Sequence, residues 1–343
     1  MSANTMSYQT LPGTDLNVSR ICLGTWQFNG GAADLTWDRQ DEATSKAIVD
    51  KALRLGINFF DTAEAYTNSE AVLGRILQGS GQRSQVIIAS KFGQCLADGR
   101  QGYTAADIEK ALTKSLEQLQ TTYIDLYQIH WPICVADMKE AVEQLEREVQ
   151  KGRIRYYGHC NFGVENMNEF EAAGGRAVSS QLAYNLLWRP IEHEILPKVK
   201  QLNMSVLAYS PLQQGLLTGK YHTVDEIPTG RKRTRLFSSN SSSAARHGQA
   251  GAEVETFEAI DNIRKICADK GLDMSSASLS WLLGEENVAS VIVGCSSPEQ
   301  LEANTKITHL DQDTQKRLRA ATDRLKAKIG SNCDLWAAES RIK

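Results

Sequence analysis

Short apolar runs alternate with amphipathic segments along most of the chain. Eight runs rich in β-branched and aromatic residues have the length and composition of buried strands. They are 20–24, 57–60, 86–90, 124–129, 154–158, 177–182, 206–210 and 290–294. Helical periodicity covers 42–55, 69–77, 105–119, 138–149, 164–172, 194–202, 254–270 and 275–283, and further helices follow the last strand. This alternation predicts strand–helix–strand units and therefore a parallel sheet.

Eight such units predict an α/β fold that closes into a (β/α)8 TIM barrel. A doubly wound dinucleotide-binding sheet would normally carry G-x-G-x-x-G after its first strand, and the chain has no such motif. Pro12-Gly13 predicts an N-terminal β-hairpin. A long insertion follows the seventh strand, and its aperiodic part, 220–251, indicates a functional or flexible loop. Without a linker or repeat, residues 1–343 are predicted to form a single domain.

Composition narrows the class of protein. The 343 residues are 41% hydrophobic and 23% charged, with a net charge of −3, which disfavours nucleic acid or an anionic membrane as partner. No signal peptide and no apolar run of about 20 residues is visible. Seven cysteines form no CxxC pair, so we expect reduced thiols in a soluble cytoplasmic protein. They are Cys22, Cys95, Cys134, Cys160, Cys267, Cys295 and Cys333. The oligomeric state is not readable.

Polar side chains follow most of the predicted strands. The carboxyl ends of barrel strands face the active site, so these residues should meet there. One such residue usually caps a helix or satisfies the core, but seven of eight ends indicate a common site. They are Asp61 with Tyr66 in its loop, Lys91, His130-Trp131, His159-Cys160-Asn161, Gln181, Tyr209-Ser210, and Gly294 to Ser297.

Four of these residues have complementary chemistry. A free tyrosine has a pKa of about 10, too high for an efficient acid at neutral pH. A nearby Lys91 ammonium should lower the pKa of Tyr66, and Asp61 should keep a buried Lys91 charged. His130 can orient a carbonyl and share the hydrogen bonding. We therefore expect a proton donor poised for an oxygen that becomes anionic.

Eight motifs in this order resemble the aldo-keto reductase family. They are LGTWQF (23–28), DTAEAY (61–66), SKFG (90–93), IHWP (129–132), GHCNF (158–162), QLAYN (181–185), AYSPLQQGLLTGKY (208–221) and VGCSSPEQLEAN (293–304). The resemblance implies carbonyl reduction by hydride transfer from NADPH. In that reading Tyr66 is the acid, Lys91 and Asp61 support it, and His130 orients the carbonyl.

The resemblance also implies a cofactor cradle. Tyr209 would stack on the nicotinamide, while Asn161 and Gln181 would hydrogen-bond its carboxamide. Ser297 is predicted to cap a helix whose N-terminus binds phosphate. The expected contacts are Gly24, Thr25, Trp26, Asp61, Cys160, Asn161, Gln181, Tyr209, Ser210, Pro211, Leu212, Gln214, Gly215, Lys220, Arg231, Arg233, Gly294, Ser296, Ser297, Gln300 and Asn304. An arginine of GRKRTR (230–235), Arg231 or Arg233, is expected to contact the 2′-phosphate with Ser296 and Gln300.

The substrate pocket is predicted to contain Trp26, Tyr66, His130 and Trp131. The two tryptophans indicate an aromatic, hydrophobic mouth suited to small aldehydes, ketones or quinones. Three positions depart from the family pattern: Cys160 replaces a common Ser, Thr67 a usual Gly, and Ala303 a frequent Glu. These departures affect the carboxamide contact, the loop shape and adenine recognition.

Two other functions remain open. Some family members are cofactor-binding β subunits of potassium channels with slow turnover, although few residues precede the barrel here. A metal-dependent barrel hydrolase is the second alternative, since His130 and His159 lie on adjacent predicted strands. No H-x-H pair or ligand cluster accompanies them, so no metal is predicted.

Overall fold

Eight parallel strands close into a barrel. The computed structural model describes residues 6–31, 40–93 and 102–343. Around the barrel the order is β10-β3-β4-β5-β6-β7-β8-β9, which confirms the predicted TIM barrel. The strands are β3 (Ile21–Gly24), β4 (Phe59–Asp61), β5 (Ile87–Phe92), β6 (Ile124–Ile129), β7 (Ile154–Cys160), β8 (Ser179–Ala183), β9 (Ser205–Tyr209) and β10 (Val288–Val293).

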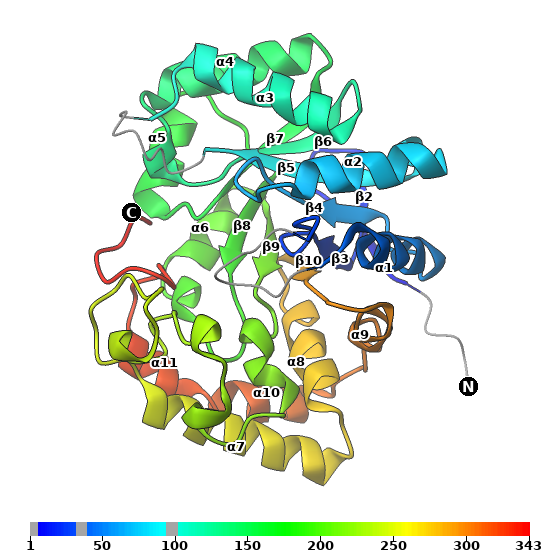
Figure 1. Ribbon diagram of the computed structural model, residues 1–343. Helices are drawn as coiled ribbons and strands as arrows, with labels where there is room; N and C mark the ends of the chain where they lie inside the picture. Colours follow the sequence, from blue (N-terminus) through cyan, green and yellow to red (C-terminus); the bar gives the residue numbers. More distant parts are fainter. Residues whose placement is uncertain (1–5, 32–39, 94–101) are drawn as a thin grey trace.

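Helices surround the strands and bury their apolar faces against them (Figure 1). They are α1 (Glu42–Arg54), α2 (Ser69–Ser80), α3 (Ala105–Leu119), α4 (Met138–Gln150), α5 (Val164–Ala172), α6 (Ile195–Gln201), α7 (Glu253–Lys270), α8 (Met274–Leu283), α9 (Pro298–Asn304), α10 (Gln312–Ala320) and α11 (Asp323–Ile329). In α3, a capping box of Thr104 and Asp107 fixes the start, and Ile108 and Leu112 are fully buried. In α3 the capping residues and the buried apolar positions therefore indicate the same helix.

The predicted hairpin precedes the barrel and covers one end of it. Its strands are β1 (Tyr8–Thr10) and β2 (Asn17–Ser19), which pair antiparallel. Leu11, Leu16 and Val18 are buried in one cluster with barrel residues such as Phe59. Because the hairpin occupies the end where the strands begin, the open end is the one where they finish.

The segment from β9 to β10 is the predicted long insertion. It contains four short 3-10 turns, η4 (Gln213–Thr218), η5 (Val224–Glu226), η6 (Thr229–Arg231) and η7 (Ser239–Ser241), followed by α7 and α8. Its last loop residues pack closely, since a side chain at Gly251 would collide with the backbone of Phe237. The end of the insertion is therefore closely packed.

The C-terminal segment returns across the barrel after α11. The backbone oxygen of Lys343 accepts from Asn166 N, and Lys343 N donates to Asn166 Oδ1, so the last residue docks at the start of α5.

Six cysteines are free thiols, and Cys95 lies outside the described residues. None of the described helices has the length and apolarity that crossing a bilayer would require.

Candidate active site

Lys91 connects two of the predicted catalytic residues. Its Nζ donates to Asp61 Oδ1 at 2.8 Å, to the backbone oxygen of Thr62 at 2.8 Å and to Tyr66 Oη at 3.4 Å. β4 and β5 are neighbours, so Asp61 and Lys91 meet inside the barrel, where each is at most 3% exposed. The structure therefore places the three side chains in one hydrogen-bonded chain.

The protonation of these three hydrogen-bonded side chains differs in one respect from what the sequence predicts. Burial raises the pKa of Tyr66 to about 12, and the opposing effect of Lys91 does not overcome it. The expected net lowering is therefore wrong, because desolvation of the phenolate exceeds the attraction of one ammonium. Burial alone would lower the pKa of Lys91, but Asp61 and Tyr66 raise it instead. Lys91 is charged and Tyr66 is protonated at neutral pH.

His130 and Trp26 border the phenol. The His130 ring meets Tyr66 edge-on with centroids 5.8 Å apart, and Trp26 stacks on Tyr66 at 5.5 Å. Burial, followed by the Lys91 charge, lowers the pKa of His130 to about 3. The imidazole is therefore neutral, and its N–H is available as a hydrogen-bond donor rather than as a cation.

The interior amides brace this group. Gln181 Nε2 donates to Asp61 Oδ2 at 2.8 Å, so Asp61 has a partner at both oxygens. Asn161 Nδ2 donates to the His130 carbonyl and to Cys160 Sγ, both at 3.1 Å, and Tyr209 Oη donates to Asn161 Oδ1 at 2.8 Å. Burial raises the pKa of the Cys160 thiol, which agrees with an unreactive small residue.

His159 is separate from this group. Its ring stacks on Phe162 at 4.4 Å and meets Phe170 of α5 edge-on, so it packs toward the helices. In the part of the chain that the structure describes, no three His, Cys, Asp or Glu side chains gather as a metal site would require.

A cavity of about 1180 Å³ opens above Tyr66 and Asp61 and runs to the start of α9. Most predicted cofactor and substrate residues line it. They are Gly24, Trp26, Asp61, Tyr66, His130, Trp131, Cys160, Asn161, Gln181, Tyr209, Ser210, Pro211, Leu212, Gln214, Gly215, Lys220, Arg231, Arg233, Gly294, Ser296, Gln300 and Asn304.

Three predicted residues are not among those that line the cavity. Lys91 is beneath Tyr66, as its proposed supporting role requires. Thr25 is fully buried and donates to the backbone oxygen of Asp61 at 2.9 Å. Ser297 Oγ accepts from Gln300 N and caps α9. The cap was predicted correctly, but Thr25 and Ser297 do not line the cavity, because the Thr25 hydroxyl bonds the Asp61 backbone and the Ser297 hydroxyl caps α9.

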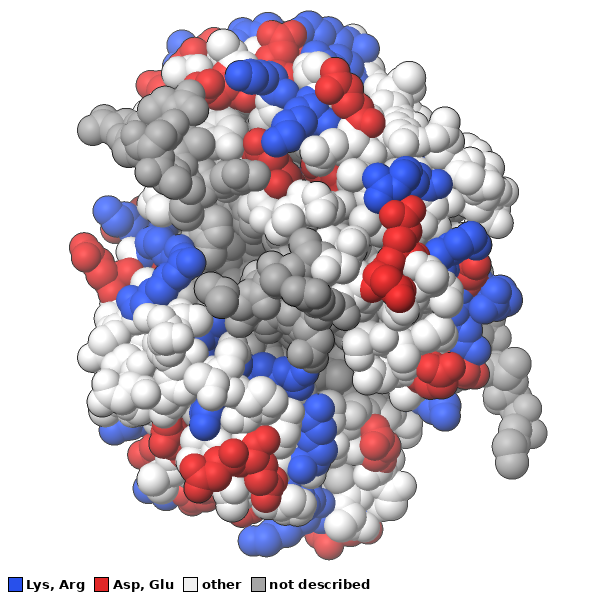
Figure 2. Space-filling view, viewed as in Figure 1, with Lys and Arg blue, Asp and Glu red and all other residues white. Residues whose placement is uncertain are grey.

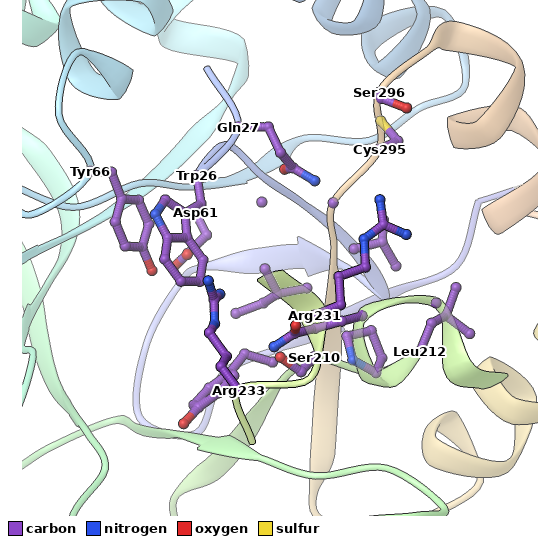
Figure 3. A pocket seen from close by; sticks show the side chains of 18 of the residues that line it. Trp26, Gln27, Asp61, Tyr66, Ser210, Leu212, Arg231, Arg233, Cys295 and Ser296 are labelled. Carbon is purple, nitrogen blue, oxygen red and sulfur yellow. The ribbon is translucent and has the colours of Figure 1, made fainter. Parts of the chain in front are cut away.

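The two arginines of the insertion lie at different places (Figure 3). Arg231 Nη1 donates to Tyr221 Oη at 3.1 Å. Arg231 Nη1 and Lys220 Nζ each lie 3.7 Å from the point where a Cβ on Gly215 would sit. Arg233 instead lies between Trp26 and Trp336. The two arginines therefore occupy different positions: Arg231 lies with Lys220 near Gly215, and Arg233 lies between the rings of Trp26 and Trp336. Contact of one of them with the 2′-phosphate stays a prediction.

Several wall residues were not predicted from the sequence. Gln27, Asp41, Thr44, 243–246, Trp336 and Arg341 also line the cavity. Arg341 stacks over Trp131 at 3.9 Å and forms an ion pair with Asp334. Trp336 and Arg341 were missed because they lie in a C-terminal segment without periodicity, where only the residue types themselves are a signal. The predicted aromatic mouth also carries positive charge, because the guanidinium groups of Arg233 and Arg341 lie over Trp26 and Trp131.

Backbone strain gathers around the cavity. Thr67, Asn161, Ser210 and Gln214 have left-handed backbones, with φ of 46°, 60°, 53° and 54°. Such values are uncommon without glycine and are enriched at functional sites. At Thr67 the loop keeps the conformation that glycine would adopt most easily, so the departure at this position does not remove the turn that presents Tyr66.

The sequence profile of the Aldo/keto reductase family matches residues 20–323. The chain belongs to this family. Its members are oxidoreductases that use nicotinamide cofactors, so the recognised motifs and the barrel lead to the same conclusion.

Relatives within the family differ in their stated roles. The NADH-specific methylglyoxal reductase of Escherichia coli is 29% identical over 316 residues, covering 87% of this chain and 92% of that protein. A probable voltage-gated potassium channel subunit β of Oryza sativa is 27% identical over 313 residues, covering 88% and 90%. The solved glycerol dehydrogenase of Gluconobacter oxydans superposes with a TM-score of 0.76 at 28% identity, covering 97% and 98%.

Proposed function

We propose that this protein reduces small aldehydes or ketones to alcohols with NADPH. The observation that carries the proposal is the chain from Asp61 through Lys91 to Tyr66 Oη at the floor of a large cavity. Relatives named for methylglyoxal reduction and glycerol oxidation support small oxygenated substrates.

The cavity residues fit a nicotinamide dinucleotide. Lys220 and Arg231 converge beside Gly215, where any side chain would fill the space between them. Within the described residues neither forms an ion pair with a carboxylate, so an anionic phosphate suits this position. The floor offers the Asn161 and Gln181 amides and the Tyr209 ring, which suit a carboxamide and a flat heterocycle.

The residues divide the chemistry as follows. When bound, the reduced nicotinamide supplies the hydride that the carbonyl carbon receives. Tyr66 Oη holds the proton that the carbonyl oxygen needs, because its pKa of about 12 keeps it protonated. As that proton leaves, the Lys91 ammonium stabilises the phenolate, and Asp61 keeps Lys91 charged. The neutral His130 N–H donates to the carbonyl oxygen and fixes its position.

Loss of nicotinamide absorbance tests this proposal directly. The folded protein is mixed with methylglyoxal, glyceraldehyde or a neutral aldehyde, and with NADPH or NADH. We expect multiple turnovers, with a lower KM for NADPH. Absence of turnover with every carbonyl would contradict the reductase proposal, whereas a preference for NADH would contradict only the NADPH assignment.

Arg231→Gln tests that assignment at one residue. A hydrogen bond to a charged group is worth roughly 1.5–3 kcal/mol, so NADPH binding should weaken about 10- to 150-fold. NADH lacks the 2′-phosphate and should bind nearly as before. The matched control is Lys232→Gln, which removes the same charge from the next residue; its Nζ donates to the Val224 backbone oxygen, and Lys232 is not among the described residues that line the cavity. Equal losses of NADPH and NADH would place Arg231 on a phosphate common to both.

A regulatory channel subunit is the second candidate. The relatedness to a potassium channel subunit β favours it. A subunit of this kind would bind the cofactor and turn over slowly. Steady-state turnover slower than about one per minute with all carbonyls, together with tight cofactor binding, would favour this role over a metabolic reductase.

A further inference from the structure

Three hydroxyl groups gather beside Asp61 and Lys91, beneath the surface of the protein. Figure 2 shows acidic and basic side chains interspersed on one face of the molecule. Thr25, Thr62 and Ser69 are instead uncharged and fully buried. They are the residue after β3, the residue after β4 and the first residue of α2. The reduction proposed above does not use these three residues, which we call the hydroxyl cluster.

Ser69 is the centre of the hydroxyl cluster. Its Oγ donates to the backbone oxygen of Thr25 at 2.8 Å, and it lies 2.7 Å from Thr25 Oγ1 and 2.9 Å from Thr62 Oγ1. A hydroxyl group has one proton to donate and two lone pairs that accept. Because the Ser69 proton goes to the carbonyl, the two threonine hydroxyls are its donors, and the Thr25 proton is shared with the Asp61 backbone oxygen, 2.9 Å away. The hydrogen-bonding capacity of Ser69 is therefore fully used.

The Ser69 hydroxyl does not cap the helix that begins with it. Serine near the start of a helix usually accepts from amides of that same helix. The N-cap residue of α2 is Asn68, whose side chain makes no capping bond and donates to the Asn29 backbone oxygen at 3.1 Å. The partners of Ser69 Oγ lie 44 and 7 positions earlier in the chain. A serine at this place is therefore explained by the segments that it joins.

Ser69 holds both ends of the contact between Lys91 and Tyr66. Its backbone N donates to the Tyr66 backbone oxygen at 2.8 Å. Its hydroxyl holds Thr62, whose backbone oxygen accepts from Lys91 Nζ at 2.8 Å. The loop that carries the phenol and the residue that anchors the ammonium are thus fixed relative to each other by one side chain.

The other side of the phenol depends on the same hydroxyl group. Ser69 Oγ bonds Thr25, and the next residue, Trp26, stacks on the Tyr66 ring with centroids 5.5 Å apart. The distance from Lys91 Nζ to Tyr66 Oη is 3.4 Å. Hydrogen bonds from nitrogen to oxygen usually measure about 2.7–3.2 Å, so a small displacement of the loop would break this contact.

We propose that Ser69 is a positioning residue for proton transfer, because its hydroxyl keeps the Tyr66 phenol in contact with the Lys91 ammonium. The inference rests on the proposed reductase function and adds a residue to it. Ser69 is fully buried and is not among the described residues that line the cavity, so it acts through Tyr66 and Lys91 rather than on the substrate. When Tyr66 gives its proton to the carbonyl oxygen, the ammonium stabilises the remaining phenolate more strongly at shorter distance. Loss of the Ser69 hydroxyl should therefore slow proton transfer and leave binding unchanged.

The first test removes the hydroxyl and keeps the backbone bond to Tyr66. In Ser69→Ala, kcat for the best carbonyl substrate should fall about 10- to 100-fold, as expected for a misplacement of up to roughly 1 Å. KM for the carbonyl and the dissociation constant of NADPH should stay close to those of the wild type. The matched control is Ser290→Ala, because Ser290 is also fully buried and its Oγ also donates to a backbone oxygen at 2.8 Å, that of Ser19. Both variants should lose thermal stability, but only Ser69→Ala should lose kcat.

A double variant separates proton transfer from a general loss of folded protein. If Ser69 acts through the phenol, Ser69→Ala should lower kcat no further once Tyr66→Phe has removed the proton. A variant that only reduces the folded fraction would cost the same factor in both backgrounds. Equal factors in the two backgrounds, or a wild-type kcat in Ser69→Ala, would overturn the proposal. Thr62→Val provides the same test if Ser69→Ala does not fold, since it keeps the side-chain shape and removes one donor to Ser69.

Hydrogen exchange provides a readout that does not depend on turnover. In the cofactor-free protein, peptides covering 61–69 should exchange their amide hydrogens faster in Ser69→Ala than in the wild type, and Ser290→Ala should leave this segment unchanged. Unchanged exchange in Ser69→Ala would show that the hydroxyl does not hold the Tyr66 loop, and the inference fails even where the wild type reduces carbonyls. If exchange rises but the wild type reduces no carbonyl, the reductase proposal fails while the hold of Ser69 on the Tyr66 loop stands.

Discussion

Two consecutive residues of β5 hold two buried carboxylates on opposite faces of the sheet. Lys91 points into the barrel and binds Asp61, whereas Ser90 points out to the helices and donates to Glu70 Oε1 at 2.5 Å. Both acids are nearly inaccessible, with 3% of Asp61 and 1% of Glu70 exposed. They differ mainly in their partners: a cation and an amide for Asp61, a hydroxyl for Glu70.

The partner decides which acid keeps its charge. Burial raises the pKa of both, but at Asp61 the Lys91 ammonium opposes it strongly at close range, and the pair persists as ions. At Glu70 the pKa rises to about 7, since a hydroxyl compensates a buried charge only weakly. Asp61 is therefore suited to keeping the Lys91 ammonium charged. Glu70 is suited to packing in its neutral form, and its ionisation at higher pH should lower the stability of the folded protein.

The largest expected effect tests what the inner pair acts on. Tyr66→Phe keeps the ring that stacks on Trp26 but removes the proton, so carbonyl reduction should fall about 10²–10⁴-fold, as for the loss of a general acid. Cofactor dissociation constants, measured by fluorescence, should stay near those of the wild type. A variant that keeps more than about a tenth of kcat would show that another group donates the proton.

A smaller and more diagnostic effect comes from the pair itself. Asp61→Asn and Lys91→Met should each lower kcat, because both act through the one phenol at Tyr66. Removing Lys91 leaves Asp61 buried without its cation, so folding is checked first by circular dichroism. The double variant should be hardly slower than the slower single variant. Independent multiplication of the two losses would show that the two residues do not work as a unit.

The fold and the inner half of the site were predictable because short-range rules govern them. Asp61 ends β4, Lys91 lies near the end of β5 and His130 follows β6, and the closed barrel fixes where strand ends meet. The insertion after β9 and the C-terminal segment have no periodic pattern, so the positions of their residues could not be predicted in this way. Arg233 packs against Trp336, and both line the cavity with Arg341, although the two segments are far apart in the sequence. No local pattern predicts such a contact.

The electrostatics were less predictable than the positions. Neighbouring charges can be guessed from motifs, but the extent of burial around Tyr66 cannot, and burial determined the direction of its pKa. The pKa of Glu70 could not be predicted from the sequence for the same reason. In the sequence it is an acid in the first turn of a helix, a position usually solvated, while in the fold that turn of α2 presses against β5.

The smallest expected effect concerns Glu70 and appears in stability rather than activity. Its folded pKa of about 7 lies above the ordinary value of 4.5, so its stabilising contribution is fully present below pH 4.5 and is lost as the pH rises through 7. Ionisation at higher pH should cost up to about 3 kcal/mol. Glu70→Gln cannot ionise, so relative to the wild type it should gain thermal stability between pH 5.5 and 8.5, with kcat unchanged.

The control is an acid in an equivalent helical position that lacks the burial. Glu165 lies in the first turn of α5 and is exposed, so Glu165→Gln should leave the dependence of Tm on pH unaltered. Glu64 and Lys114 also act on Glu70, but both remain in each variant and their effects cancel in the comparison. If Glu70→Gln and the wild type lose stability in parallel as the pH rises, Glu70 is not the titrating group, and the contrast between the two faces of β5 would rest on packing rather than on charge.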